Sequence, residues 1–311
     1  MLGLGKYNYD RFTKELLLRD VLAGRSAGPR PGERAPGFSA RTLEGAEIAL
    51  RDFRDKKNVV LILGSATCPF TAASIAALNR LDREHGGDDV QFLFVYVREA
   101  HPGERLPAHR RAADKLRAAE RFQAEEGIEM PVLVDGLGGG IHRKYGKLPN
   151  PTYLIDRSGR VAFRCLWTRP QAIERALREL RERQWERDVA HAVVLGGEYS
   201  DLPPAGTLWR GHRALDRGGR QAARNFRREM GLPLGITVAT GRLLRPVVDS
   251  PRQTATLLAL SGGIAAGGIF LGRYLRSRHP RNTARKRTVP PHVKPPALQP
   301  APSDSQRLAQ D

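Results

Sequence analysis

Two almost fully apolar stretches, residues 59–63 (VVLIL) and 90–97 (VQFLFVYV), restrict the fold of this chain more than any other feature. Each is followed by a segment with helical character, at residues 71–84 and 109–126. Consecutive apolar residues predict strands covered on both faces, because neighbouring side chains of a strand point to opposite sides. The alternation therefore predicts an α/β sheet flanked by helices.

Shorter signals complete the expected domain, which we place at residues 32–185. Two apolar segments at residues 152–156 and 161–167 are joined by a tight turn, so they predict an antiparallel hairpin and hence a mixed sheet. The remaining predictions are strands at residues 37–43, 47–50 and 131–135, and a helix at residues 171–183. A mixed sheet in this order, with a cysteine where the first long strand meets its helix, is the thioredoxin-like arrangement.

That cysteine, Cys68, is one of only two in 311 residues. At the start of a helix it would gain from the helix dipole and from unpaired backbone N–H groups, so we expect a lowered thiol pKa. Pro69 suits the first turn of the helix. A second cysteine of a CxxC motif would stand where the chain has Thr71, so Cys68 acts without a near dithiol partner. Cys165 falls on the expected core face of its strand, as a small buried residue or as a resolving thiol.

The motifs around Cys68 resemble those of the iodothyronine deiodinases. Residues 64–70 (GSATCPF) are similar to the family's Gly-Ser-x-Thr-selenocysteine-Pro-Pro-Phe. The family's later motifs also have counterparts in the same order: residues 95–101 (VYVREAH), 106–109 (LPAH), Asp114, Ala118 and Ala119, 131–135 (PVLVD) and 145–149 (YGKLP). The chain departs from the pattern at Phe70 and Thr71, where the family has its second proline, and at residues 149–151 (PNP), where it has Pro-Glu-Arg.

The resemblance implies a reductive dehalogenase that removes iodine from an aromatic substrate. Cys68 stands at the selenocysteine position, as the nucleophile, and Glu99, His101 and His109 stand at active-site positions. Glu99 would orient His101 and raise its pKa, so that the histidine donates a proton. Ser65, Thr67 and Pro69 would support the site. Pro149, or failing that Pro151, would be the cis-proline that thioredoxin folds place opposite the thiol.

Two other functions remain open. Residues 32–56 resemble the opening of peroxiredoxin-type folds, and Ser65 lies three residues before Cys68 as in a one-cysteine thiol peroxidase, with Arg164 or Arg160 as its arginine. The non-enzymatic alternative is a membrane-tethered thioredoxin-fold binding module. Both enzymatic hypotheses require an external thiol reductant of the thioredoxin or glutathione type, with an aromatic compound or a peroxide as substrate. Neither requires a cofactor or a metal ion.

Four segments are expected outside the domain. Residues 1–31 are expected to form an amphipathic helix, at residues 10–23 with Phe12, Leu16, Leu17 and Leu22 on one side, followed by a linker. Residues 186–253 are expected to be a basic linker region. Residues 254–272 are a candidate transmembrane helix, with glycines spaced for helix pairing and therefore for a homodimer. A basic, proline-rich disordered tail is expected at residues 273–311.

Charge and cysteine content bear on location and partners. The net charge is +19, and residues 201–311 hold 19 basic and 6 acidic side chains. Such a segment suits anionic surfaces, and beside the apolar stretch we expect membrane lipids rather than nucleic acid. The first residues lack the apolar part of a secretory signal, so we expect folding in a reducing cytoplasm. The combined prediction is a C-terminally anchored protein whose catalytic domain faces the cytoplasm.

Overall fold

The protein is represented by a computed structural model that describes residues 7–26, 28–186, 193–198, 211–231, 236 and 240. The chain divides into a compact unit at Met1–Thr256 and a second at Leu257–Asp311. Every element described below belongs to the first unit. The predicted transmembrane helix lies almost wholly in the second unit and outside the described residues, as does the predicted tail. No helix in the described ranges has the length and apolar character to cross a membrane.

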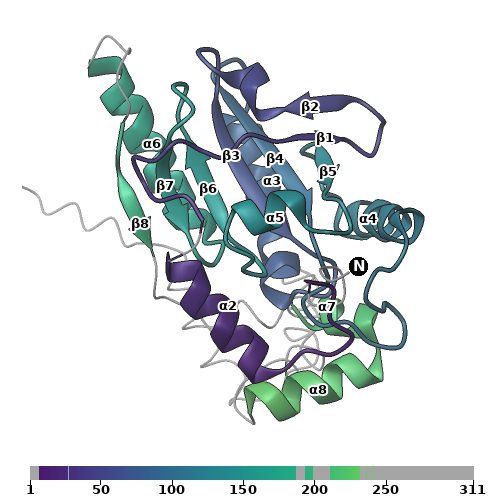
Figure 1. Cartoon of the computed structure of the whole chain (residues 1–311). Coiled ribbons are helices and arrows are strands. Elements are labelled where there is room, and N and C mark those ends of the chain that lie inside the picture. The colour runs from purple at the N-terminus through teal and green to yellow at the C-terminus, as the bar shows by residue number, and fades with distance from the viewer. Residues whose placement is uncertain are drawn as a thin grey trace, which may run out of the picture. The chain divides into compact units, whose positions relative to one another are not determined.

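A six-stranded mixed sheet forms the centre of the fold, in the order β5-β4-β3-β6-β7-β8 (Figure 1). Strands β3, β4 and β5 are parallel, β6 runs antiparallel to β3 and to β7, and β8 runs parallel to β7. The strands are β3 (Asn58–Gly64), β4 (Val90–Tyr96), β5 (Val132–Val134), β6 (Thr152–Ile155), β7 (Val161–Cys165) and β8 (Gly196–Glu198). The predicted mixed sheet and its β6–β7 hairpin are confirmed.

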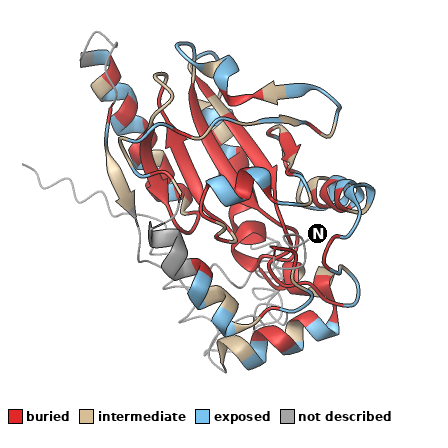
Figure 2. Cartoon of the chain, viewed as in Figure 1, coloured by how far each residue is buried: buried red, intermediate tan, exposed pale blue. Residues whose placement is uncertain are grey.

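Both faces of the sheet are covered, as the continuous apolar runs predict. Along β3, Val60 and Ile62 pack on one face and Val59, Leu61 and Leu63 on the other. Figure 2 shows buried residues along the central strands. The first face packs against helices α3 (Pro69–His85), α4 (Ala112–Glu126) and α6 (Pro170–Glu186). The second packs against the hairpin β1 (Ser39–Arg41) and β2 (Glu47–Ala49), the short helix η1 (Leu50–Phe53) and helix α5 (Gly140–Lys144). This is the predicted thioredoxin-like arrangement.

Three helices outside the predicted domain lie at the end of the sheet where β3 and β4 end (Figure 1), and we call them the cap. They are α2 (Lys14–Ser26), α7 (His212–Gly218) and α8 (Arg220–Met230). The first turn of α2 meets the last turn of α8 (Figure 1), where the backbone N–H of Lys14 donates to Glu229 at 3.1 Å. The N-terminal helix is thus confirmed, four residues later than its predicted start.

The predicted boundary at residue 185 is wrong. Strand β8 extends the sheet beyond it, and helices α7 and α8 belong to the same compact unit as the sheet. The sequence of this region is rich in arginine and glycine, so its few apolar residues give little periodic signal. Their burial depends on a surface that the folded domain provides.

Candidate active site

Cys68 lies at the junction between β3 and α3. It is the N-cap residue of α3, with extended backbone angles (φ −88°, ψ 114°), and Pro69 follows in the first turn. The carbonyl of Cys68 accepts the first helical hydrogen bond from Ala72 at 3.1 Å. The predicted position at a helix N-terminus is therefore confirmed, and Pro69 contributes there as a residue that needs no N–H partner.

The surroundings of the thiol are apolar. Cys68 is 1% exposed, and it belongs to a cluster with Phe70, Ala100, Leu148, Leu166, Trp167, Leu215 and Phe226. Leu215 and Phe226 come from the cap. Burial raises the pKa of the Cys68 thiol, although the nearby hydroxyl of Thr71 and the backbone amides of Thr71 and Phe70 act in the opposite direction. The predicted lowering of this pKa is wrong, because loss of water outweighs the helix N-terminus.

The carboxylate of Glu99 is the polar centre of the site. Its Oε2 accepts hydrogen bonds from the backbone N–H and the hydroxyl of Thr67, at 2.9 and 2.6 Å. Its Oε1 accepts from the hydroxyl of Tyr96 and is 3.0 Å from Nε2 of His109. Burial raises the pKa of Glu99, but the bonds from His109, Thr67 and Tyr96 outweigh it, so that the pKa is lowered and the buried carboxylate is ionised.

Ser65 and Thr67 join the Cys68 turn to the loop after β4. The hydroxyl of Ser65 accepts from the N–H of Ala100 at 3.2 Å, and that of Thr67 accepts from the N–H of His101 at 3.0 Å. Thr67 also donates to Glu99, so the residue beside Cys68 is hydrogen-bonded to the carboxylate. These contacts connect the turn at Cys68 to the loop that carries Glu99 and His101.

His101 does not pair with Glu99 as predicted. Its ring packs between Phe12 and Phe226, with centroids 4.3 and 5.1 Å away, and its buried Nδ1 has no hydrogen-bond partner among the described residues. Burial lowers the pKa of His101 to about 3, against the smaller opposing effect of Glu99. The ring is therefore neutral near pH ~7, and the predicted protonated role is wrong. Glu99 pairs with His109 instead, and His109 precedes α4, which begins at Ala112.

The cap is fitted closely to the loops that carry Cys68 and His101. A β-carbon added at Gly211, before α7, would lie 2.6 Å from Cβ of Pro69. One added at Gly218 would lie 2.8 Å from the carbonyl oxygen of His101. Arg217 of α7 donates to the carbonyl of Ala66 at 3.2 Å and binds Glu125 and Glu126 of α4. The glycines permit contacts that any side chain would prevent.

The N-terminal segment is attached through a buried arginine. The guanidinium of Arg98 pairs with Asp20 of α2, donates to the carbonyls of Tyr7 and Lys147, and lies over the rings of Tyr7 and Tyr9. Tyr9 in turn donates to the carbonyl of Ala100 at 2.9 Å. Arg98 lies beside Glu99 in the VYVREAH motif, so the same loop carries the carboxylate and anchors part of the cap.

The remaining predicted site residues are two prolines, the second cysteine and two arginines. All peptide bonds of the described residues are trans, so the expected cis-proline at Pro149 or Pro151 is absent. Cys165 is 1% exposed in the main core, in a cluster other than that of Cys68, and the two cysteines do not form a disulfide. Arg164 donates to the carbonyls of Gly28 and Pro29, and Arg160 to that of Gly32. Both candidate peroxidase arginines thus bind the N-terminal linker.

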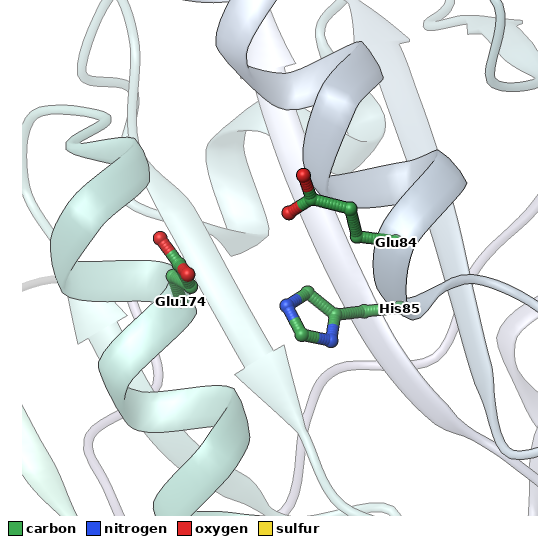
Figure 3. Close-up of side chains that lie close together, drawn as sticks. All are labelled: Glu84, His85 and Glu174. Carbon is green, nitrogen blue, oxygen red and sulfur yellow. The ribbon is translucent and has the colours of Figure 1, made fainter.

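A second group of titratable side chains lies at the far end of α3 from Cys68. Glu84, His85 and Glu174 of α6 place one donor atom each within 4.8 Å of one another (Figure 3). Glu84 pairs with Arg80 at 3.6 Å and Glu174 with Arg178 at 2.5 Å. Each carboxylate is therefore already paired with an arginine of its own helix, and we assign no metal to this group.

Known proteins are similar to the central part of the chain. Residues 31–164 match the AhpC/TSA family. A thyroxine 5-deiodinase of Gallus gallus is 30% identical over 40% of this chain and 52% of its own length, and a type I iodothyronine deiodinase of Xenopus laevis is 28% identical over 43% and 55%. The chain thus spans about half the length of these deiodinase relatives. The thiol-disulfide oxidoreductase ResA of Bacillus thuringiensis is 28% identical over 42% of this chain and 66% of its own.

Solved structures align with about half of the chain. A putative DsbE-type thiol:disulfide interchange protein from Chlorobium tepidum has a TM-score of 0.40 and 22% identity, and the alignment covers 49% of this chain and 98% of that protein. The sheet order, the strand register and the position of Cys68 at the start of α3 define a thioredoxin-like fold. The chain has Thr71 where a CxxC motif would have its second cysteine.

Proposed function

We propose that the protein is a single-cysteine thiol oxidoreductase that reductively dehalogenates an aromatic substrate, with Cys68 as nucleophile. One observation carries the proposal: the ionised Glu99 is hydrogen-bonded both to Thr67, the neighbour of Cys68, and to His109. A proton-handling couple is thereby fixed beside the apolar cluster around Cys68. The aromatic side chains of Phe70, Trp167 and Phe226 around the thiol suit an aromatic ring.

The proposed reaction begins at the sulfur of Cys68. The thiolate of Cys68 attacks the iodine atom, so that an S–I bond forms, the C–I bond breaks and its electron pair stays on carbon. Nε2 of His109 is directed to the Glu99 carboxylate, so the carbon takes a proton from Nδ1 of the same ring, and the ring regains a proton when the next thiol reacts. A small thiol then displaces iodide from the sulfur to give a mixed disulfide, and a second thiol releases Cys68. The net change converts the iodinated compound and two thiols into the deiodinated compound, a disulfide and hydrogen iodide.

The buried thiol adds a requirement for access. At 1% exposure the sulfur is covered by Leu215 and Phe226 of the cap, so a substrate reaches it only after part of the cap moves. The same movement would admit water and reverse the effect of burial on the thiol pKa. We therefore propose that substrate binding and thiol activation occur together.

A thiol peroxidase is the second candidate, because residues 31–164 match the AhpC/TSA family. Against it, Arg164 and Arg160 donate to the carbonyls of Pro29 and Gly32. A non-catalytic binding module is disfavoured by the ionised Glu99, because a buried carboxylate with four donors is costly to build for partner binding alone.

The test incubates the full chain with dithiothreitol and either an iodinated phenol or hydrogen peroxide. We expect iodide release that is lost in Cys68→Ser and kept in the matched control Cys165→Ser. Peroxide consumption without iodide release would establish the second candidate instead. Turnover that survives Cys68→Ser in both assays, or no turnover in either, would overturn the assignment of Cys68 as an enzymatic nucleophile.

A further inference from the structure

An arginine-rich cavity lies between the cap and the loop that follows β4. Its volume is about 370 Å³, and its lining carries a net charge of +3, from Arg105, Arg220, Arg224, Arg227 and Asp216. Arg105 belongs to the loop after β4, whereas the other four residues belong to α7 and α8. The cavity is therefore strongly basic, and it is built from two parts of the molecule.

Helix α8 presents its arginines to this cavity in a single row. Arg220, Arg224 and Arg227 are spaced by four and then three residues, so they share one face of the helix. Gly219 and Ala223 line the cavity as well. Their small size leaves room beside the longer arginine side chains.

The four arginines of the cavity lack carboxylate partners. None of them forms an ion pair within the part of the chain that the structure describes, although neighbouring arginines of the cap do. Arg217 binds Glu125 and Glu126, and Arg228 binds Glu229. Unpaired guanidinium groups around a small volume repel one another, and a bound anion would remove that repulsion.

Glu104, an acid at the edge of the cavity, is already engaged. It lies against Gly219, and its carboxylate accepts from the backbone N–H groups of Arg220 and Gln221 at 2.5 and 2.8 Å. It is also in electrostatic contact with Arg105. The N-terminus of α8 is therefore capped from within the chain, so a ligand would meet the guanidinium groups rather than the helix end.

The cavity spans the contact between the cap and the loop after β4. The backbone N–H of Arg105 donates to the carbonyl of Gly218 at 3.2 Å, and its guanidinium donates to the carbonyl of Asp216 at 3.5 Å. The buried face of α8 carries Phe226, which clusters with Cys68. An anion held by Arg105 and α8 together would thus strengthen the contact that covers the thiol.

We propose that the cavity binds a small anion with phosphate groups, which bridges Arg105 to the arginines of α8 and holds the cap over Cys68. Guanidinium groups bind phosphate oxygens through pairs of parallel hydrogen bonds, and several of them together favour an anion with more than one charge. A free phosphate ester and the phosphate of a lipid headgroup share this chemistry. The inference does not depend on the reaction that Cys68 carries out.

The first test measures the binding of inorganic pyrophosphate to the full chain by calorimetry, at constant ionic strength. We expect binding that is weakened by about tenfold or more in Arg224→Gln/Arg227→Gln. The control Arg41→Gln/Arg121→Gln has the same net charge, but it changes exposed arginines outside the cavity. Equal affinity of the two double variants would show a response to overall charge and would overturn the site, as would no binding by the wild-type chain.

The second test measures the rate at which iodoacetamide alkylates Cys68. An anion that binds only the closed cap should slow alkylation about tenfold when pyrophosphate is present at about ten times its dissociation constant. Arg105→Gln should remove most of this protection, because the bridge then loses its anchor on the sheet domain. Pyrophosphate that binds to the cavity without slowing alkylation would overturn the bridge.

Vesicles distinguish the two sources of phosphate. Flotation with phosphatidylcholine vesicles, with and without phosphatidic acid, compares the same two double variants. Loss of the phosphatidic acid-dependent binding in Arg224→Gln/Arg227→Gln alone would support the site and identify a lipid headgroup as its ligand. Equal vesicle binding by both, together with the expected difference in pyrophosphate affinity, would support the site with a free phosphate ester as its ligand.

Discussion

Glu99 and Cys68 lie on neighbouring loops and both are buried, yet their surroundings differ in kind. All four donors to Glu99 come from Thr67, Tyr96 and His109, within the sheet domain. The thiol is covered in part by residues of the cap, which the sequence places outside that domain. The hydrogen bonds to Glu99 are therefore maintained by the sheet domain alone. The exposure of the Cys68 thiol depends also on helices that come from outside that domain.

Removing the charge at Glu99 should have the largest effect. In Glu99→Gln an NH₂ group must face donors that need an acceptor, so we expect a loss of about 3–5 kcal/mol in the free energy of unfolding. Turnover should fall by about a hundredfold or more. Urea unfolding and iodide release measure the two effects. The control is Glu120→Gln, an exposed acid of α4. Equal stability of the two variants would show that the Glu99 network contributes little.

Loosening the cap should have the next largest effect, on the thiol alone. In Gly211→Val the side chain meets Pro69, which costs about 1–3 kcal/mol of cap attachment. We expect alkylation of Cys68 by iodoacetamide, followed by mass spectrometry, to be about tenfold faster. The matched control is Gly37→Val, where an added β-carbon has no neighbour within 4 Å. An unchanged alkylation rate would mean that the thiol is already accessible in solution.

The buried ring of His101 should make the protein sensitive to acid. Its folded-state pKa of about 3 lies below the unfolded value of about 6.5, so the unfolded chain binds the extra proton first as the pH falls. Stability from this group is present above about pH 6.5 and is lost progressively toward about pH 3. We expect the stability difference between about pH 7 and about pH 5 to shrink by about 2 kcal/mol in His101→Leu.

A residual acid sensitivity should persist in that variant. His142 is buried between Tyr7 and the carbonyl of Leu148, and burial lowers its pKa as well. Urea denaturation of both proteins at the two pH values provides the comparison. Identical pH slopes would contradict the neutral, buried state of His101.

The smallest effect is expected at the second cysteine. Cys165 lies in the main core rather than in the cluster of Cys68. Cys165→Ala should cost about 1 kcal/mol of stability and change turnover by less than about twofold. A large loss of thiol-dependent turnover at unchanged stability would identify Cys165 as a resolving thiol after all.

Much of the fold was predictable because it depends on local patterns. Apolar residues at consecutive positions identified β3 and β4, and a proline after Cys68 marked the start of α3. The motif resemblance placed Glu99 and His109 at active-site positions, and the folded chain brings these two side chains into contact. The pairing of Glu99 with His109 rather than His101 was not predictable, since it depends on which imidazole the aromatic residues Phe12 and Phe226 enclose.

The sequence by itself determined a thioredoxin-like sheet with one thiol at a helix N-terminus, since strand burial and helix starts follow from the order of neighbouring residues. Only the tertiary structure decided the ionisation of that thiol. Residues of the cap help to exclude water from Cys68. Two of them, Leu215 and Phe226, lie more than a hundred residues after Cys68 in the sequence. Likewise Arg105 and the arginines of α8 line one cavity only because the folded chain brings the loop after β4 to the cap.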